Sequence, residues 1–122
     1  MTNDLSKQHE KINYVEFPVS NMDASKQFFN TVFDWAFEDY GEDYAAFLNA
    51  GIDGGFYRSE QVVSTKNGSA LVVFYSKALE ATQEKIEKAG GNIIEPIFSF
   101  PGGRRFHFSD PSGNEYAVWS DH

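Results

Sequence analysis

Cysteine is absent from this sequence of 122 residues. Disulfide-stapled scaffolds, cysteine-ligated zinc sites, iron–sulfur clusters and thiol nucleophiles are therefore excluded. Long apolar runs are also missing: the longest, such as residues 71–75, are far too short to span a bilayer. The first ten residues contain no apolar stretch, so we expect no signal peptide and a cytoplasmic location.

Positive charge is scarce. Lys and Arg together number 10 against 18 Asp and Glu, and the formal net charge is −8. A protein that binds nucleic-acid phosphates or anionic lipids normally has the opposite balance. The one basic pair is Arg104-Arg105, which is far short of a patch. We therefore predict neither a nucleic-acid partner nor a membrane partner. A glycine-rich phosphate loop and a nucleophile-elbow serine are missing as well.

Aromatic side chains are what this chain has in quantity. It contains 12 Phe, 6 Tyr and 2 Trp, and 41% of its residues are hydrophobic. This composition and length predict one globular domain with one core. Most of the aromatic rings are expected to pack in that core, but there are more than a minimal core requires, so some are expected to line a pocket.

The chain contains an internal repeat. Residues 12–19 alternate like a strand and are followed by a helix signal, and residues 69–75 do the same. Position 14 corresponds to position 71, and position 22 to position 79, at one constant offset. Two copies indicate a pseudo-symmetric pair of modules, because a solenoid needs three or more stacked units.

The repeat extends to the order of the elements. We predict helices over 21–33 and 78–89, and strands over 11–19, 35–40, 44–48, 55–58, 69–76, 93–100, 104–109 and 115–119. Ser20 or Asn21 is expected to cap the first helix, and Gly90-Gly91 to end the second. Each half is thus β-α-β-β-β, an α+β arrangement in which the helix covers the outside of the strands. We expect a flexible tail over 1–10 and a single domain over 11–120, with modules about 11–58 and 69–120.

Two stretches resemble the vicinal oxygen chelate superfamily, which contains glyoxalases, bleomycin-resistance proteins and extradiol dioxygenases. Residues 14–35 are similar to its opening strand and helix, and residues 108–114 resemble its penultimate turn, in which Asp-Pro-x-Gly-Asn is frequent. The resemblance covers about residues 11–120. It implies two βαβββ modules whose sheets curl into a half-open barrel around a ligand cavity. It also implies a homodimer, to which Phe28, Phe29 or Trp35 could contribute.

Many members of that superfamily hold a divalent metal in the cavity. The resemblance places the usual ligand positions on Tyr14, Leu71 and Ala117, with a fourth near residues 55–57. Leu and Ala have no donor atom, and a neutral Tyr is a poor ligand for zinc, nickel or manganese. We therefore expect no metal and no other cofactor. A divalent metal held by an alternative set stays open, and that set is Glu16, His107 and Glu115.

Six residues are candidates for ligand binding: Tyr14, Glu16, Tyr75, Arg105, His107 and Trp119. Strand residues two apart share a face, which places Tyr14 with Glu16 and Arg105 with His107. Tyr75 and Trp119 are expected to be aromatic pocket walls. Arg105 and His107 either meet an anionic ligand or form a polar outer face. Tyr14 either binds a substrate through its hydroxyl or fills the space of a metal.

The catalytic group is unknown from sequence, and Glu16 is the one candidate, as a general base. Its alternative is a carboxylate that pairs with Arg105 or lies at the rim. Two functions therefore stay open. The first is a metal-free member that binds a small apolar or aromatic organic molecule. The second is a glyoxalase-type lyase or isomerase that uses a non-standard metal site or a metal-free carboxylate, so the sequence does not decide whether the chain is an enzyme.

Overall fold

The computed structural model describes residues 5–122, and the predicted order of elements occurs in it twice. The first module contains β1 (Tyr14–Val19), α1 (Met22–Phe33), β2 (Ala36–Asp39), β3 (Tyr44–Leu48) and β4 (Asp53–Arg58). The second contains β5 (Val72–Tyr75), α2 (Leu79–Lys88), β6 (Asn92–Phe100), β7 (Gly103–Ser109) and β8 (Glu115–Ser120). Short 3₁₀ turns form at η1 (Ser6–Gln8) and η2 (Thr65–Asn67).

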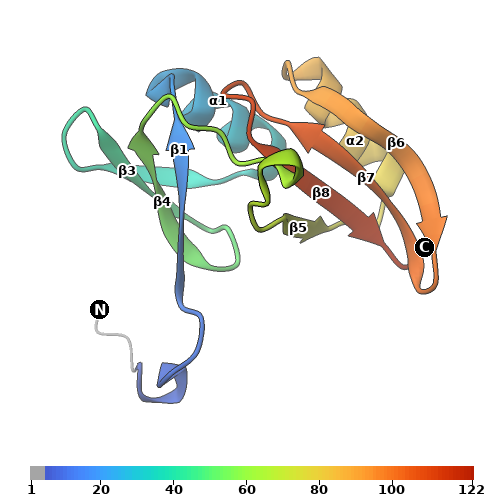
Figure 1. Cartoon of the computed structure of the whole chain (residues 1–122), viewed down its shortest axis with the longest axis horizontal. Coiled ribbons are helices and arrows are strands. Elements are labelled where there is room, and N and C mark those ends of the chain that lie inside the picture. Colours follow the sequence, from blue (N-terminus) through green and yellow to red (C-terminus); the bar gives the residue numbers. More distant parts are fainter. Residues whose placement is uncertain (1–4) are drawn as a thin grey trace.

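Each module contributes one mixed sheet of four strands. The strand orders are β1-β4-β3-β2 and β5-β8-β7-β6, and the first strand of each module runs parallel to its last. Figure 1 shows the two sheets side by side, with both helices on the same side of them. The predicted α+β fold of two βαβββ modules is confirmed, and the sheets do not close on each other.

The first helix forms where the sequence predicts it. Asn21 is extended, and its side-chain oxygen accepts a hydrogen bond from the backbone N–H of Ala24 at 3.1 Å, as an N-cap does. The second helix is followed by Gly90, whose φ of +98° is the left-handed conformation that favours glycine after a helix.

The core lies between the helices and one face of each sheet. Phe29 is fully buried at its centre, with its ring stacked on Trp35 at 4.6 Å and edge-on to Tyr116 at 5.4 Å. Phe28 is buried beside it. The core covers nearly all of these rings, which leaves little of Phe28, Phe29 or Trp35 for the dimer contact expected from the sequence, and the dimer itself stays a prediction.

The turn at residues 110–114 joins the two modules. Asn114 is fully buried, and its amide donates a hydrogen bond to the carbonyl oxygen of Pro18 in β1 at 2.6 Å. Its side-chain oxygen accepts from the backbone N–H of Val63 in the connector at 2.8 Å. One side chain thus holds the first module, the connector and the second module together.

Asp110 stabilises the same turn through hydrogen bonds. One of its oxygens accepts from the backbone N–H groups of Ser112 and Asn114, both at 2.9 Å, and the other accepts from the Tyr116 hydroxyl at 3.1 Å. Burial raises the pKa of Asp110 from 3.8 to about 6, although these hydrogen bonds act in the opposite direction.

The raised pKa of Asp110 predicts a pH dependence of stability. The folded chain holds the Asp110 proton more tightly than the unfolded chain, so this contribution is complete below the unfolded pKa of 3.8 and is lost as the pH rises through about 6. A shift of about two units corresponds to about 3 kcal/mol. We expect Asp110→Asn to remove this loss while keeping the contacts, because its amide can donate to Tyr116. Urea unfolding at about pH 4 and pH 7.5 measures it, and an equal loss in the variant would contradict it.

The predicted tail is described only in part. Residues 1–4 lie outside the described residues, and the exposed η1 turn lies within the remainder of the tail. Its flexibility stays a prediction. Between residues 5 and 122, no helix is both long and apolar enough to cross a membrane.

Candidate functional site

The second sheet has one face packed in the core and one face that points away from it, which the connector covers in part at Glu115. Phe106 and Phe108 of β7 are fully buried in the core, so Arg105 and His107, which alternate with them, lie on the opposite face, as predicted. Arg105 is flanked across the sheet by Phe98 of β6 and Trp119 of β8. In Figure 1 the helices lie behind this sheet, and the connector with η2 lies in front of it. We call the side that carries Arg105, His107 and Trp119 the open face.

Arg105 forms no ion pair with a carboxylate in the part of the chain that the structure describes. Its guanidinium lies over the rings of Phe98 and Phe100, 5.4 and 5.9 Å from their centroids. Its Nε is buried and has no hydrogen-bond partner among residues 5–122. The alternative in which Glu16 pairs with Arg105 is wrong, because Glu16 accepts a hydrogen bond from Tyr44 in the first sheet. A buried donor without an acceptor is costly, so Arg105 is suited to receive one from a ligand.

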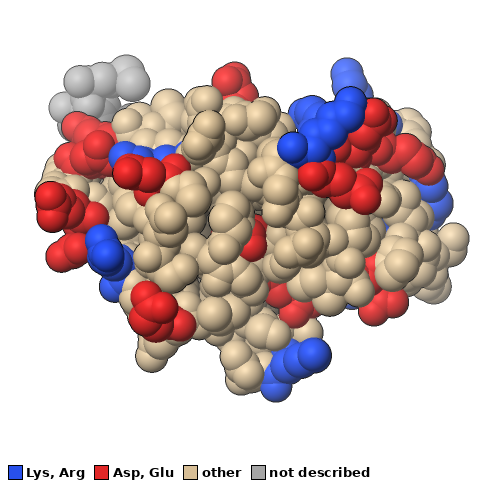
Figure 2. Space-filling model, turned by 90° about the horizontal axis from the view of Figure 1, so that it is seen from above, with Lys and Arg blue, Asp and Glu red and all other residues tan. Residues whose placement is uncertain are grey.

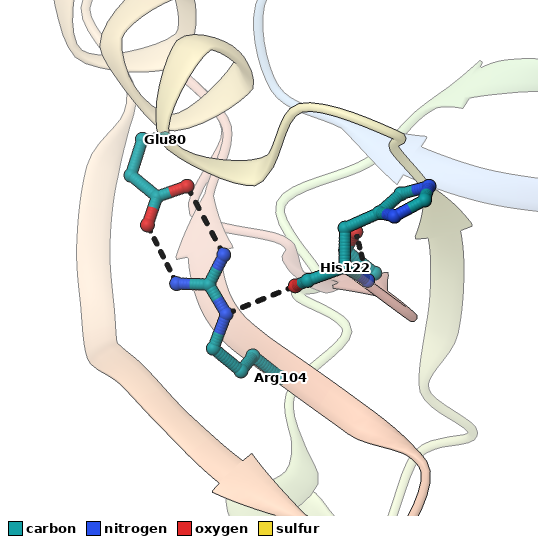
Figure 3. Close-up of polar contacts among 4 residues, drawn as sticks. Glu80, Arg104 and His122 are labelled. Atoms are coloured by element: carbon teal, nitrogen blue, oxygen red, sulfur yellow. Dashed lines mark hydrogen bonds and ion pairs between the residues drawn. The ribbon is translucent and has the colours of Figure 1, made fainter.

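The neighbouring arginine shows the contrast. Arg104 donates from its terminal nitrogens to both oxygens of Glu80 in α2, at 2.5 and 3.2 Å, and from Nε to the carbonyl oxygen of His122 at 3.1 Å (Figure 3). Its guanidinium is therefore engaged within the chain. Of this adjacent pair, Arg105 is the one whose Nε has no partner among residues 5–122.

His107 is held by a carboxylate. Its Nδ1 lies 2.8 Å from one oxygen of Glu115, and the other oxygen accepts from the backbone N–H and the hydroxyl of Thr65, both at 2.9 Å. Burial on its own raises the pKa of Glu115, but the hydrogen bonds from His107 and Thr65 outweigh it, and the pKa lies below its usual value. Glu115 is thus ionised and accepts the hydrogen of Nδ1.

The other ring nitrogen of His107, Nε2, makes no hydrogen bond within residues 5–122. This nitrogen is buried as well. In a neutral ring it offers a lone pair, and in a protonated ring it offers a hydrogen to an anion. The sequence placed Glu115 in an alternative metal set, but the structure gives it the role of orienting His107.

Aromatic rings extend this group along the open face. Phe98 lies 6.0 Å from the His107 ring, Phe100 lies 6.3 Å from Trp119, and Trp119 meets Tyr75 edge-on at 5.2 Å. Four of the six predicted residues are therefore brought together: Tyr75, Arg105, His107 and Trp119. Their role in binding stays a prediction.

Phe98 and Phe100 were missed by the sequence reasoning. The register between β6 and β7 shifts twice, between Ile93 and Glu95 and between Glu95 and Phe98. Simple alternation therefore does not tell which β6 side chains reach the open face. One signal could have indicated them. Phe98 and Phe100 are two residues apart, so they share a face, and they lie directly across a tight turn from Arg104-Arg105.

The other two predicted residues lie in the first sheet. The hydroxyls of Tyr14 and Tyr44 are 2.5 Å apart, and Tyr44 donates to Glu16 at 2.9 Å. The pKa of Tyr44 is raised by burial and then by its hydrogen bonds to Tyr14 and Glu16. Tyr44 was not predicted. Its ring occupies the space over Gly55, where an added Cβ would lie only 2.3 Å from the hydroxyl.

The positions of the superfamily metal do not fit a divalent cation in this chain. The Tyr14 hydroxyl is bonded to Tyr44, the space at Gly55 is filled by that same ring, and Leu71 and Ala117 have no donor. In the alternative set, His107 and Glu115 meet each other, but Glu16 is bonded within the other sheet. Within residues 5–122, no three His, Asp or Glu side chains converge in a metal-binding group.

The surface charge agrees with the composition. Figure 2 shows acidic side chains around the rim of one face and basic side chains in small groups, mostly beside acidic ones. The face drawn has no continuous basic field of the kind that binds phosphate backbones.

Comparison with known proteins places this architecture. A profile of the Glyoxalase/Bleomycin resistance protein/Dioxygenase superfamily matches residues 11–118. No curated protein matches the chain. A glyoxalase-related enzyme from Fulvimarina pelagi has a similar structure, with a TM-score of 0.75 and 16% identity over 91% of this chain and 88% of that one.

Two further solved structures share the fold. A glyoxalase/bleomycin resistance protein/dioxygenase family enzyme from Burkholderia phytofirmans has a TM-score of 0.75 and 12% identity over 90% of this chain and 98% of that one. An E126Q mutant of the fosfomycin resistance protein FosX from Listeria monocytogenes, complexed with Mn(II) and 1S,2S-dihydroxypropylphosphonic acid, has a TM-score of 0.76 and 15% identity over 90% and 89%. The fold, the repeat and the profile match lead to one conclusion: the chain belongs to the Glyoxalase/Bleomycin resistance protein/Dioxygenase superfamily.

Proposed function

We propose that this protein binds a small organic molecule that has a flat aromatic or apolar body and one anionic group, on the open face of the second sheet. One observation carries the proposal: Arg105 Nε and His107 Nε2 are both buried on that face without a partner among the described residues 5–122. Buried polar groups are normally hydrogen-bonded, so two neighbouring exceptions support a polar group supplied by a ligand, with an acceptor for the N–H of Arg105 Nε and a hydrogen-bond partner of either kind for His107 Nε2.

Different residues of the open face contact different parts of the ligand. The Arg105 guanidinium donates to the anionic group in a charge-assisted hydrogen bond. The His107 ring, which Glu115 orients through Nδ1, offers Nε2 as a second polar contact. Tyr75, which is 52% exposed, and Trp119 offer ring surface to the flat body. The ligand needs no metal in this arrangement, because the Arg105 guanidinium supplies the positive charge.

The relatives support the choice of an anionic ligand. FosX, which shares the fold at 15% identity, was crystallised with a phosphonic acid together with Mn(II). In the present chain the open face carries an unpaired cation in place of a converging set of metal ligands among its described residues. We propose that the positive charge comes from protein side chains here.

A quenching titration tests this proposal. 4-Bromobenzoate combines a ring, a carboxylate and a bromine that quenches tryptophan emission on contact. We expect saturable quenching of the wild-type protein in buffer with EDTA, and strongly reduced quenching in Trp119→Phe, which retains only Trp35. Quenching that does not saturate, or that is equal with neutral bromobenzene at Trp119, would contradict the proposal.

Three expectations from the sequence also stay proposals. We propose a homodimer, supported by exposed Tyr14, Val73 and Tyr75 on the sheet faces, because a second copy over the open face would enclose a ligand. Sedimentation would show twice the 13.8 kDa of one chain. A cytoplasmic location would be tested by cell fractionation. The lyase or isomerase alternative would be tested by a search for turnover.

A further inference from the structure

The two modules leave a pocket at their seam. It has a volume of about 370 Å³ and lies between the edge strands β1 and β5, each of which pairs with a neighbour on one side only. The turn between β3 and β4, at residues 50–52, forms its outer wall. No strand bridges β1 and β5 in the described chain, so the sheets leave this space open. We call it the seam pocket.

The floor of the seam pocket is rigid and aromatic. Phe17, Trp35 and Phe47 line it and are 3%, 5% and 1% exposed. Trp35 lies 4.6 Å from Phe47 and 5.9 Å from Phe74 of β5, which also lines the pocket. Because the core fixes these rings, the pocket is formed before any ligand arrives, which lowers the cost of binding.

The lining excludes charge. None of the residues 5–122 that line the seam pocket is Asp, Glu, Lys, Arg or His, although the whole chain has a net charge of −8. A charged ligand would lose its hydration there without compensation, whereas a neutral ring would gain contacts on several sides. A volume of about 150 Å³ holds a benzene-sized molecule, and typical ligand sites begin at about 300 Å³. The volume of the seam pocket therefore suits one or two rings.

We propose that the seam pocket is a second binding site, for a neutral apolar molecule of one or two rings, separate from the anion-binding open face. The open face presents Arg105 and His107 and takes an anion, whereas the seam pocket has neither. Tyr75 lies at the boundary, because it lines the mouth of the seam pocket and touches Trp119. The seam site does not depend on the function proposed for the open face.

The two tryptophans of the sequence report on the two sites separately. Trp35 lines the seam pocket and Trp119 lies on the open face. In Trp119→Phe, Trp35 is the one tryptophan left, so all tryptophan emission comes from the seam pocket. We expect bromobenzene to quench this variant saturably and 4-bromobenzoate to leave it nearly unchanged. If the open-face proposal alone is wrong, this result is unaffected.

A charge at the mouth provides the matched variant. Ile52 lines the pocket and is 37% exposed, whereas Leu48 is 46% exposed on β3 and does not line it. In the Trp119→Phe background, Ile52→Glu is expected to weaken bromobenzene binding at least about tenfold, because the carboxylate would be desolvated by the ligand. Leu48→Glu is expected to change it less than about twofold.

Three results would overturn the seam-site proposal. The first is quenching of Trp35 that rises linearly without saturation. The second is quenching that is equal in Ile52→Glu and Leu48→Glu. The third is quenching that is absent at protein concentrations where the dimer forms and present only after dilution. This result would mean that a second copy, and not a small molecule, covers the seam.

Discussion

Replacing Arg105 with methionine is expected to weaken the binding of 4-bromobenzoate by about 30-fold or more. Removing one partner of a buried, hydrogen-bonded charge pair costs about 2 kcal/mol or more, and each 1.4 kcal/mol is about a factor of ten in the dissociation constant. Methionine keeps an apolar stem against Phe98 and Phe100, so the lost group is mainly the guanidinium. The fluorescence titration of Trp119 measures the change.

The adjacent arginine is the control. Arg104→Met removes an equal charge from the same strand, but Glu80 and His122 already occupy that guanidinium (Figure 3). We expect its dissociation constant to stay within about twofold of wild type. Arg105→Lys is expected to recover little, because a point charge does not reproduce the planar donor geometry. Equal losses in the two methionine variants would point to general electrostatics and would contradict a direct role of Arg105.

Stability separates a binding role of Arg105 from a structural one. In the free protein its Nε is a buried donor to which residues 5–122 offer no acceptor, which is unfavourable for folding. Arg105→Met is therefore expected to unfold at a urea concentration equal to or higher than wild type, while it binds more weakly. A clear loss of stability would mean that the contacts of the guanidinium with Phe98 and Phe100 stabilise the fold, and that Arg105 has a structural role.

Replacing Asn114 with alanine is expected to lower the free energy of unfolding by about 2–4 kcal/mol. The change leaves the carbonyl of Pro18 and the N–H of Val63 without their partner. Each unsatisfied buried group costs about 1–3 kcal/mol. Because Asn114 ties the first module and the connector to the second sheet, we also expect weaker cooperativity between the modules. Urea unfolding, followed by both tryptophan emission and circular dichroism, measures both effects.

An asparagine at the surface of the connector is the comparison. Asn67 reaches the Val62 carbonyl at 3.4 Å and is exposed, so Asn67→Ala is expected to change the stability by less than about 0.5 kcal/mol. If Asn114→Ala were equally mild, the turn at residues 110–114 would not be the link between the modules, and the structural reason for its Asp-Pro-x-Gly-Asn pattern would have to be sought elsewhere.

The elements were predictable because their signals are local. Alternation over β7 predicted that Arg105 and His107 share one face, and this is confirmed, because Phe106 and Phe108 are buried on the other face. The cap at Asn21 was also read correctly. The predicted strand 69–76 shrank to Val72–Tyr75, because strand length depends on pairing with β8, which local sequence does not contain.

The site was predictable only in part because its contacts join distant segments. Thr65 reaches Glu115 from the connector, and Tyr44 reaches Glu16 across 28 positions. Neither contact leaves a periodic trace in the sequence. Arg105 has no carboxylate partner among the described residues because Glu16 is bonded to Tyr44 and Glu80 to Arg104. These pairings are known only from the structure.

The most direct test of the central claim is the NMR signal of the Arg105 Nε–H during a titration with 4-bromobenzoate in the presence of EDTA. Because this donor is buried and has no partner within residues 5–122, a carboxylate that binds to it must shift its resonance. We predict a saturating shift with the dissociation constant found by quenching of Trp119. Binding that leaves this resonance unchanged, or that occurs only after a divalent metal is added, would contradict the account.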